Sequence, residues 1–144
     1  MLVSVVRAKG PPKIFTDASM PRARFTDVDL SGARFENVKL NAARIEDACA
    51  DAATIRDVSL RRAKLTDCDL TSATLTNVAL DRVRIEDASL RGARWTNVDL
   101  RDVVIEDANL EGLTIDGVRI DRLIDAARAA AKKPSAPPKR VRRG

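Results

Sequence analysis

Aspartates recur every twenty residues through the middle of the sequence. The column consists of Asp27, Asp47, Asp67, Asp87 and Asp107. Carboxylates stacked in a line could bind a cation or imitate the phosphates of DNA. Asp and Asn also hydrogen-bond backbone groups at turns, and ten residues further on a second column reads Asn37, Asp57, Asn77 and Asn97. The pattern favours turn chemistry, with binding as the alternative.

A column of basic residues lies three positions before the aspartates. It comprises Arg24, Arg44, Lys64 and Arg84, and it ends at Val104. Opposite charges at strand spacing usually compensate each other on a solvated surface and stabilise it little. The alternative is a ridge that binds an acidic partner.

The third group of charges is at the C-terminal end. Residues 126–144 hold seven basic and no acidic side chains, whereas the preceding 125 residues hold 19 basic and 21 acidic ones. Lys139, Arg140, Arg142 and Arg143 could contact nucleic acid phosphates, an anionic membrane or an acidic protein surface. With no Tyr and one Trp, base stacking is not expected, so nucleic-acid binding would be weak and non-specific. A solubilising role fits the tail equally well.

Other chemistry is excluded by composition. The chain has no His, which removes the usual general base, the Ser-His-Asp arrangement and the His-containing zinc motifs. Its two cysteines cannot form a disulfide framework or a thiolate metal site. We therefore expect no catalytic residue, no cofactor and no metal, and the chain is not expected to be an enzyme.

The elements that position these columns must turn every five residues. From Phe15 to Ile120 every fifth residue is apolar, and Ala50 is the one small member of this series. Two places earlier, positions 18 to 118 are Ala, Val or Cys, except Leu113. A helix repeats every 3.6 residues and a strand every two, so neither explains this rhythm. Self-similarity over twenty units predicts a solenoid.

Tandem A-x-L-x-x units such as "ARFEN", "AKLTD", "ATLTN" and "ANLEG" resemble the pentapeptide-repeat family. The resemblance implies an all-β, right-handed quadrilateral β-helix. Each five-residue unit would form one side, four units one coil, and the central and minus-two residues would point inward. About five coils at strand spacing would form a rod about 25 Å long.

The ends of such a rod need covers. We expect residues 1–13 to cap the N-terminal end, residues 14–120 to form the β-helix, residues 121–133 to form a helix at the C-terminal end, and residues 134–144 to be a disordered basic tail. In the helix, Asp121 is suited to the N-cap and Leu123, Ile124 and Ala127 form an apolar stripe. The chain is expected to be a monomer or an end-to-end homodimer.

The repeat also assigns the two cysteines. Cys68 takes an inward minus-two slot and should behave as a small hydrophobe, whereas Cys49 takes an outward slot as a free thiol. They face opposite ways, so an internal disulfide is not expected.

These observations predict a non-catalytic interaction or scaffold module that binds a protein partner through its outward ladders, with the basic tail as a second contact surface. Some members of the resembled family regulate type II topoisomerases by DNA mimicry, which is the alternative function. That role calls for a strongly acidic surface, and residues 14–120 hold 19 acidic against 15 basic side chains. Nucleic-acid association through the tail is the third option. No transmembrane run or signal peptide is recognisable, and we expect a cytoplasmic protein.

Overall fold

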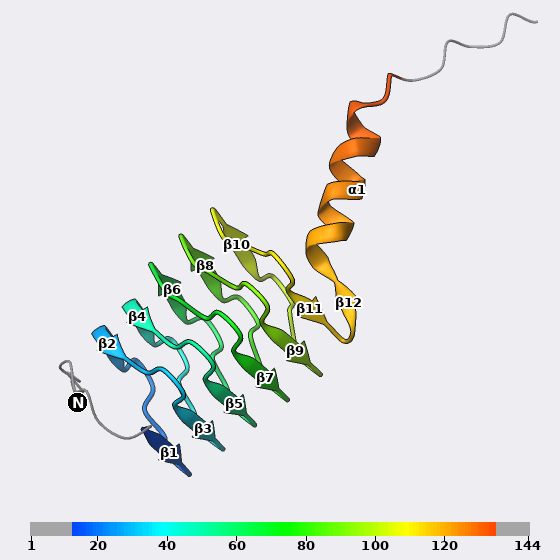
Figure 1. The fold of residues 1–144 in the computed structure, drawn as a ribbon. Helices are drawn as coiled ribbons and strands as arrows, with labels where there is room; N and C mark the ends of the chain where they lie inside the picture. The colour runs from blue at the N-terminus through cyan, green and yellow to red at the C-terminus, as the bar shows by residue number, and fades with distance from the viewer. Residues whose placement is uncertain (1–12, 135–144) are drawn as a thin grey trace, which may run out of the picture.

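The computed structural model describes residues 13–134, which form two sheets, parallel except for the last strand, and one C-terminal helix (Figure 1). One sheet, which we call the odd sheet, contains the odd-numbered strands and β12 in the order β1-β3-β5-β7-β9-β11-β12. The other, the even sheet, has the order β10-β8-β6-β4-β2. Strands of the odd sheet are β1 (Ile14–Thr16), β3 (Arg34–Glu36), β5 (Thr54–Arg56), β7 (Thr74–Thr76), β9 (Arg94–Thr96), β11 (Thr114–Ile115) and β12 (Val118–Arg119). Strands of the even sheet are β2 (Arg24–Asp29), β4 (Arg44–Cys49), β6 (Lys64–Thr66), β8 (Arg84–Glu86) and β10 (Val104–Glu106).

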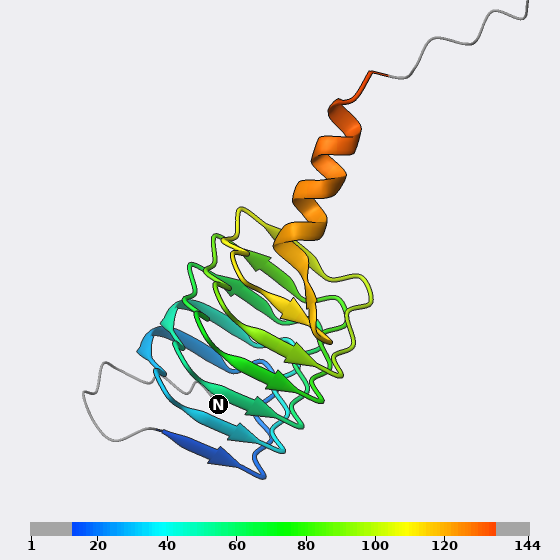
Figure 2. The same ribbon diagram turned by 45° about the vertical axis from the view of Figure 1, so that its right-hand side comes forward.

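Each coil pairs with the next one twenty residues along the chain. Phe25, Ile45, Leu65 and Ile85 are in register on consecutive even strands, and the odd strands repeat the same offset. Isolated bridges such as Ser59↔Ala79 and Asp69↔Ser89 join the coils on the two remaining sides. The result is a four-sided solenoid whose open centre in the ribbon is filled by side chains (Figure 2).

The core confirms the inward facing of both apolar positions. Phe25, Leu90 and the minus-two residues Ala33, Ala73 and Ala93 are fully buried. No polar or charged residue is buried anywhere in residues 13–134. Because the interior is apolar, charged side chains are displayed on the outside.

Left-handed backbone conformations produce the corners. Every coil has residues with φ near +50° to +60°, including Asp27, Arg22 and Ala42. L-residues adopt this region at a cost, which Asn, Asp and Gly bear most easily. Two of the four corners of a coil carry Asp or Asn, and a third carries Gly32, Gly92 and Gly112 in three of its coils. The remaining corner carries arginines, which are discussed below.

The chain leaves the solenoid through a hairpin that the five-residue pattern does not predict. Asp116 and Gly117 both have positive φ, and β12 runs back antiparallel to β11. Two consecutive left-handed residues, Asp then Gly, form a tight hairpin turn. Val118 was expected to point inward, but this expectation is wrong: the reversal leaves its side chain 47% exposed.

Helix α1 (Ile120–Lys132) extends beyond the C-terminal coil rather than across it (Figures 1 and 2). It buries no residue: Leu123 is 55% exposed and Ala127 is exposed, whereas Ile124 is half-buried beside residues 108–111, so the last coil covers only part of the expected stripe. Asp121 is not the N-cap, because Arg119 occupies that position and Asp121 lies in the first turn. Nothing in residues 13–134 is a helix long and apolar enough to cross a membrane. The expected N-terminal cap lies outside the described residues, apart from Lys13.

Candidate binding surface

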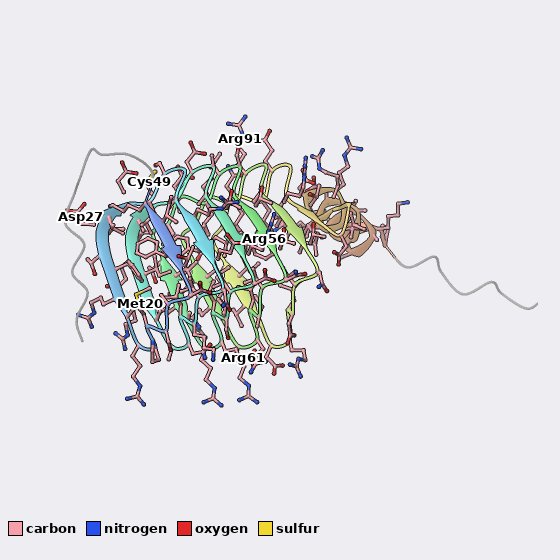
Figure 3. All side chains as sticks on the ribbon, turned by 90° about the horizontal axis from the view of Figure 1, so that it is seen from below. Met20, Asp27, Cys49, Arg56, Arg61 and Arg91 are labelled. Carbon is pink, nitrogen blue, oxygen red and sulfur yellow. The ribbon has the colours of Figure 1, made fainter. Side chains whose placement is uncertain are left out.

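The basic column lies at the starts of the even-sheet strands, and the acidic column lies at the corner three residues later. Arg24, Arg44, Lys64 and Arg84 each begin a strand of this sheet, and their Cα atoms are partners in consecutive coils. The Asp27 column forms the corner at the other edge, three residues later, and Figure 3 labels Asp27 near the N-terminal end of the rod. Lys64 and Arg84 form ion pairs with glutamates that lie between the two columns.

Charge compensation is confined to the C-terminal half of the basic column. Lys64 Nζ lies 2.9 Å from a Glu86 carboxylate oxygen, and Arg84 lies 3.0 Å from Glu86 and 3.9 Å from Glu106. These contacts lower the pKa of Glu86, first through its hydrogen bonds with Lys64 and then with Arg84. Among the residues that the structure describes, Arg24 and Arg44 form neither an ion pair nor a side-chain hydrogen bond.

A second set of arginines, which the sequence interpretation missed, lies along the corner before the even sheet. We call this the arginine corner: Arg22, Ala42, Arg62, Arg82 and Asp102. Backbone bonds fix it, as from Arg22 N to Asn41 O at 2.8 Å and from Ala42 N to Arg61 O at 2.8 Å. The sequence signal was the return of Arg at positions 22, 62 and 82, which the five-residue apolar pattern does not include.

Two hollows lie on either side of this corner. One is lined by Arg22, Arg24, Ala42 and Arg44. The other is lined by Pro21, Arg22, Asn41, Ala42, Arg61, Arg62 and Asp81. Ala42 lies in both because its short side chain leaves a gap between Arg22 and Arg62. Figure 3 labels Arg61 at this edge of the rod, where long basic side chains project outward.

The aspartate column adopts the conformation that the turn interpretation requires. Asp27, Asp47, Asp67, Asp87 and Asp107 all have φ between 50° and 53°. Opposite them, Asn37 donates to Asp17 at 2.6 Å, Asn77 to Asp57 at 3.0 Å and Asn97 to Asn77 at 2.6 Å. The backbone conformation and hydrogen bonds of the corners therefore explain why Asp and Asn occur in both columns, without a bound partner.

The two cysteines have the environments that the repeat predicts. Cys68 is 3% exposed, and burial raises the pKa of its thiol to about 11. Cys49 is partly exposed, and its Sγ lies 3.1 Å from Ser31 Oγ. Both thiols are free.

No group of His, Cys, Asp or Glu in residues 13–134 is arranged to hold a metal ion. The candidate tail residues Lys139, Arg140, Arg142 and Arg143 lie outside the described residues.

Parallel coils with twenty-residue register and two inward apolar positions per side define a quadrilateral β-helix. The chain belongs to the pentapeptide-repeat family: a family model described as pentapeptide repeats, in eight copies, matches residues 15–47, 53–88 and 84–120. This match covers most of the solenoid.

Two solved structures have the same architecture. A pentapeptide repeat protein, Rfr23, from the cyanobacterium Cyanothece 51142 superposes with a TM-score of 0.60 at 17% identity, covering 78% of this chain and 88% of that one. A pentapeptide repeat protein from the Arabidopsis thaliana thylakoid lumen gives a TM-score of 0.53 at 22% identity, covering 72% and 73%. At these identities the likeness shows the fold alone. No curated protein matches the sequence.

Proposed function

We propose that the protein is a non-catalytic interaction module that binds a protein partner through the even sheet and the adjoining arginine corner. The observation that carries this proposal is the fixed ladder of outward charges. Arg44, Lys64 and Arg84 begin strands that are paired to the coils on both sides, and Arg24 begins the edge strand β2, which is paired to β4, so the charges are held at the strand spacing of about 4.8 Å. A partner with a matching series of groups would meet a surface that needs little reorganisation.

The charge of the arginine corner and of the strand residues that follow it favours an acidic partner for that part of the surface. Residues 21–26, 41–46 and 61–66 together hold six basic and one acidic side chain. The equivalent segments of the next two coils, 81–86 and 101–106, hold three basic and four acidic ones. A basic patch at one end of the rod would steer an acidic partner and fix its orientation.

The same distribution does not favour DNA mimicry. A surface that imitates the DNA duplex must present closely spaced negative charge. With the aspartate corner included, residues 21–29, 41–49 and 61–69 hold six basic and six acidic side chains, so the even sheet presents balanced charge and not closely spaced negative charge. Association through the basic tail stays a prediction about residues that the structure does not describe.

The proposal is tested by affinity capture from a nuclease-treated lysate, with mass spectrometry of the recovered proteins. Four baits are compared: the intact chain, the chain ending at Lys133, Arg24→Gln/Arg44→Gln, and the odd-sheet control Arg34→Gln/Arg56→Gln. We expect one set of proteins to be recovered by the intact, truncated and control baits and lost from the even-sheet variant. Loss only on truncation would assign binding to the tail, and equal recovery by all four would contradict the proposal.

A further inference from the structure

Four arginines in and beside the arginine corner carry uncompensated positive charge around a gap. Arg22, Arg24, Arg44 and Arg62 are exposed, and none forms an ion pair or a side-chain hydrogen bond with another residue of the described part of the chain. Neighbouring arginines are compensated: Arg61 by Asp81 at 2.9 Å, Arg82 by Asp102 at 3.9 Å and Arg84 by Glu86 at 3.0 Å. The uncompensated arginines therefore lie in the first three coils of the even sheet, and in the third coil only Arg62 is uncompensated, because Arg61 and Lys64 have acidic partners.

This arrangement is unfavourable for the fold itself. Arg24, Arg44 and Lys64 are direct partners on adjacent strands, and like charges in that position repel. Arg22 and Arg62 have φ of 60° and 59°, a left-handed conformation that is less favourable for arginine than for glycine. The opposite corner meets the same constraint with Gly32 and Gly92 and with the small residues Ala52 and Ser72. Side chains that destabilise their own scaffold are a physical reason to look for a ligand.

We propose that Arg22, Arg24, Arg44 and Arg62 form a binding site for a phosphate group, centred on the gap at Ala42. Arginine is suited to phosphate because its planar guanidinium donates two parallel hydrogen bonds to neighbouring oxygens. A phosphate monoester carries nearly two negative charges and three acceptor oxygens. It matches four unpaired guanidinium groups better than the single charge of a carboxylate does.

The extent of the patch limits the ligand. Coils stack at about 4.8 Å, so the uncompensated residues span about 10 Å along the rod. That distance accommodates one phosphate group or two adjacent ones, and is short for the footprint of a nucleic acid duplex. Trp95 is buried, and no aromatic residue of the described chain is exposed beside the corner to stack on a base. These features favour a phosphorylated side chain or a small phosphorylated compound over a polynucleotide.

Glu46 is the one acidic side chain in these three segments, two residues after Arg44 on the same strand. It forms no ion pair within the described residues, so it does not hold the Arg44 guanidinium away from the gap. Asp81 borders the second hollow, but its carboxylate is engaged by Arg61. The four arginines therefore determine the charge of the site.

The test titrates the full chain with three probes at matched ionic strength: inorganic pyrophosphate, a phosphoserine peptide with its unphosphorylated control, and a single-stranded oligonucleotide. NMR of the arginine Nε–H groups reports both affinity and position. We expect shifts at Arg22, Arg24, Arg44 and Arg62 with pyrophosphate, with the phosphopeptide, or with both. Binding of the phosphopeptide alone identifies a modified protein as the source, and binding of pyrophosphate alone identifies a small compound.

Two variants from one column provide the matched comparison. Arg44→Gln should weaken phosphate binding at least tenfold and, without phosphate, raise the melting temperature at low salt by relieving repulsion. Arg84→Gln, which loses its contacts with Glu86 and Glu106, should bind phosphate as the unmodified chain does and melt at a lower temperature. The melting temperatures of the two variants also show that each one folds.

Equal affinity of Arg44→Gln and Arg84→Gln for pyrophosphate would overturn the inference. So would binding no stronger than that of chloride, or tighter binding of the oligonucleotide that increases with its length. The inference rests on the proposed function only if the phosphate belongs to a partner protein. Phosphate binding without a captured partner would support the phosphate site and contradict the proposed interaction module. A partner captured without phosphate binding would support the interaction module and contradict the phosphate site.

Discussion

At the scale of single residues, Ala50 interrupts a column of leucines in the core. Leu30 and Leu70 occupy the equivalent positions one coil before and one coil after it. An internal cavity of about 40 Å³ is lined by Ala50 together with these two leucines, Phe35 and Cys68, among other residues. The space that a leucine would occupy at position 50 is therefore left as a cavity, because the neighbouring side chains do not move in to fill it.

Filling this void should stabilise the protein. Ala50→Leu restores the column, and we expect the free energy of unfolding to rise by about 1 kcal/mol, from the apolar surface buried and the cavity removed. Ala33→Leu is the matched control, because Ala33 is fully buried and does not line the cavity, so overpacking should cost about 1–3 kcal/mol. Chemical denaturation followed by Trp95 fluorescence measures both. A clear loss of stability in Ala50→Leu would show that the slot is already filled.

At the scale of elements, the junction between coil and helix depends on Asp121. Its carboxylate accepts hydrogen bonds from Gly112 N at 2.9 Å, Arg122 N at 2.9 Å and the Arg119 guanidinium. The Arg119 contact, followed by the Gly112 amide, holds the pKa of this carboxyl well below its usual value of 3.8. The interaction ties the first turn of α1 to the last coil, while the rest of the helix has few partners.

Removing this carboxylate should release the helix. A 13-residue helix is marginal in water on its own, so Asp121→Asn should reduce the ellipticity at 222 nm and speed exchange of the Gly112 amide about tenfold. Because the folded pKa is depressed, the contribution of Asp121 is complete above pH 3.8 and decreases as the pH falls toward the folded value. Asp125→Asn, one turn further on, is the control and should leave both signals unchanged. An unchanged helix in Asp121→Asn would contradict this role.

Most strands could be predicted from the sequence, because a fixed five-residue phase determines the turning points and the inward positions together. The exit from the solenoid could not, although "TIDGVR" contains the Asp-Gly pair typical of tight hairpins. Val118 and Ile120 continue the five-residue apolar pattern, so that pattern did not indicate that the chain reverses at Gly117. Because β12 is followed directly by Ile120, the hairpin also places the start of α1 beside the last coil.

The candidate site was only partly predictable for a related reason. Columns at spacing twenty place Arg24 and Arg44 in one line, and the structure confirms their register. Whether a charge is compensated depends on residues in other columns, such as Glu86 for Lys64 and Arg84. Those contacts depend on the length and conformation of side chains that extend across the sheet and the corner. The five-residue period of the sequence gives no information about them.

At the scale of the whole molecule, each coil contacts only its neighbours. Stability in such a solenoid is approximately a sum of coil and interface contributions, so damage should remain local. Phe25 is fully buried near the N-terminal end and packs edge-on against Phe15, with ring centroids 6.3 Å apart. Leu90 is fully buried nearer the other end.

Truncating either residue should therefore loosen one half of the rod. We expect Phe25→Ala, which costs about 3–5 kcal/mol, to accelerate amide exchange in β2–β4 much more than in β8–β10. Leu90→Ala should show the reverse order. Native-state hydrogen exchange read by NMR measures both variants. Uniform acceleration along the rod in either one would indicate global unfolding in place of local opening.

The pairing of each residue with the one twenty positions later also constrains how the length of this protein can change. A duplication of twenty residues would add one complete coil and return every downstream column to its own side of the rod. An insertion of five would keep the core phase but turn everything after it by a quarter of a revolution, joining the columns of one side to those of the next. The solenoid can therefore grow by whole coils without disturbing an existing recognition surface, whereas a single added repeat would break that surface in two.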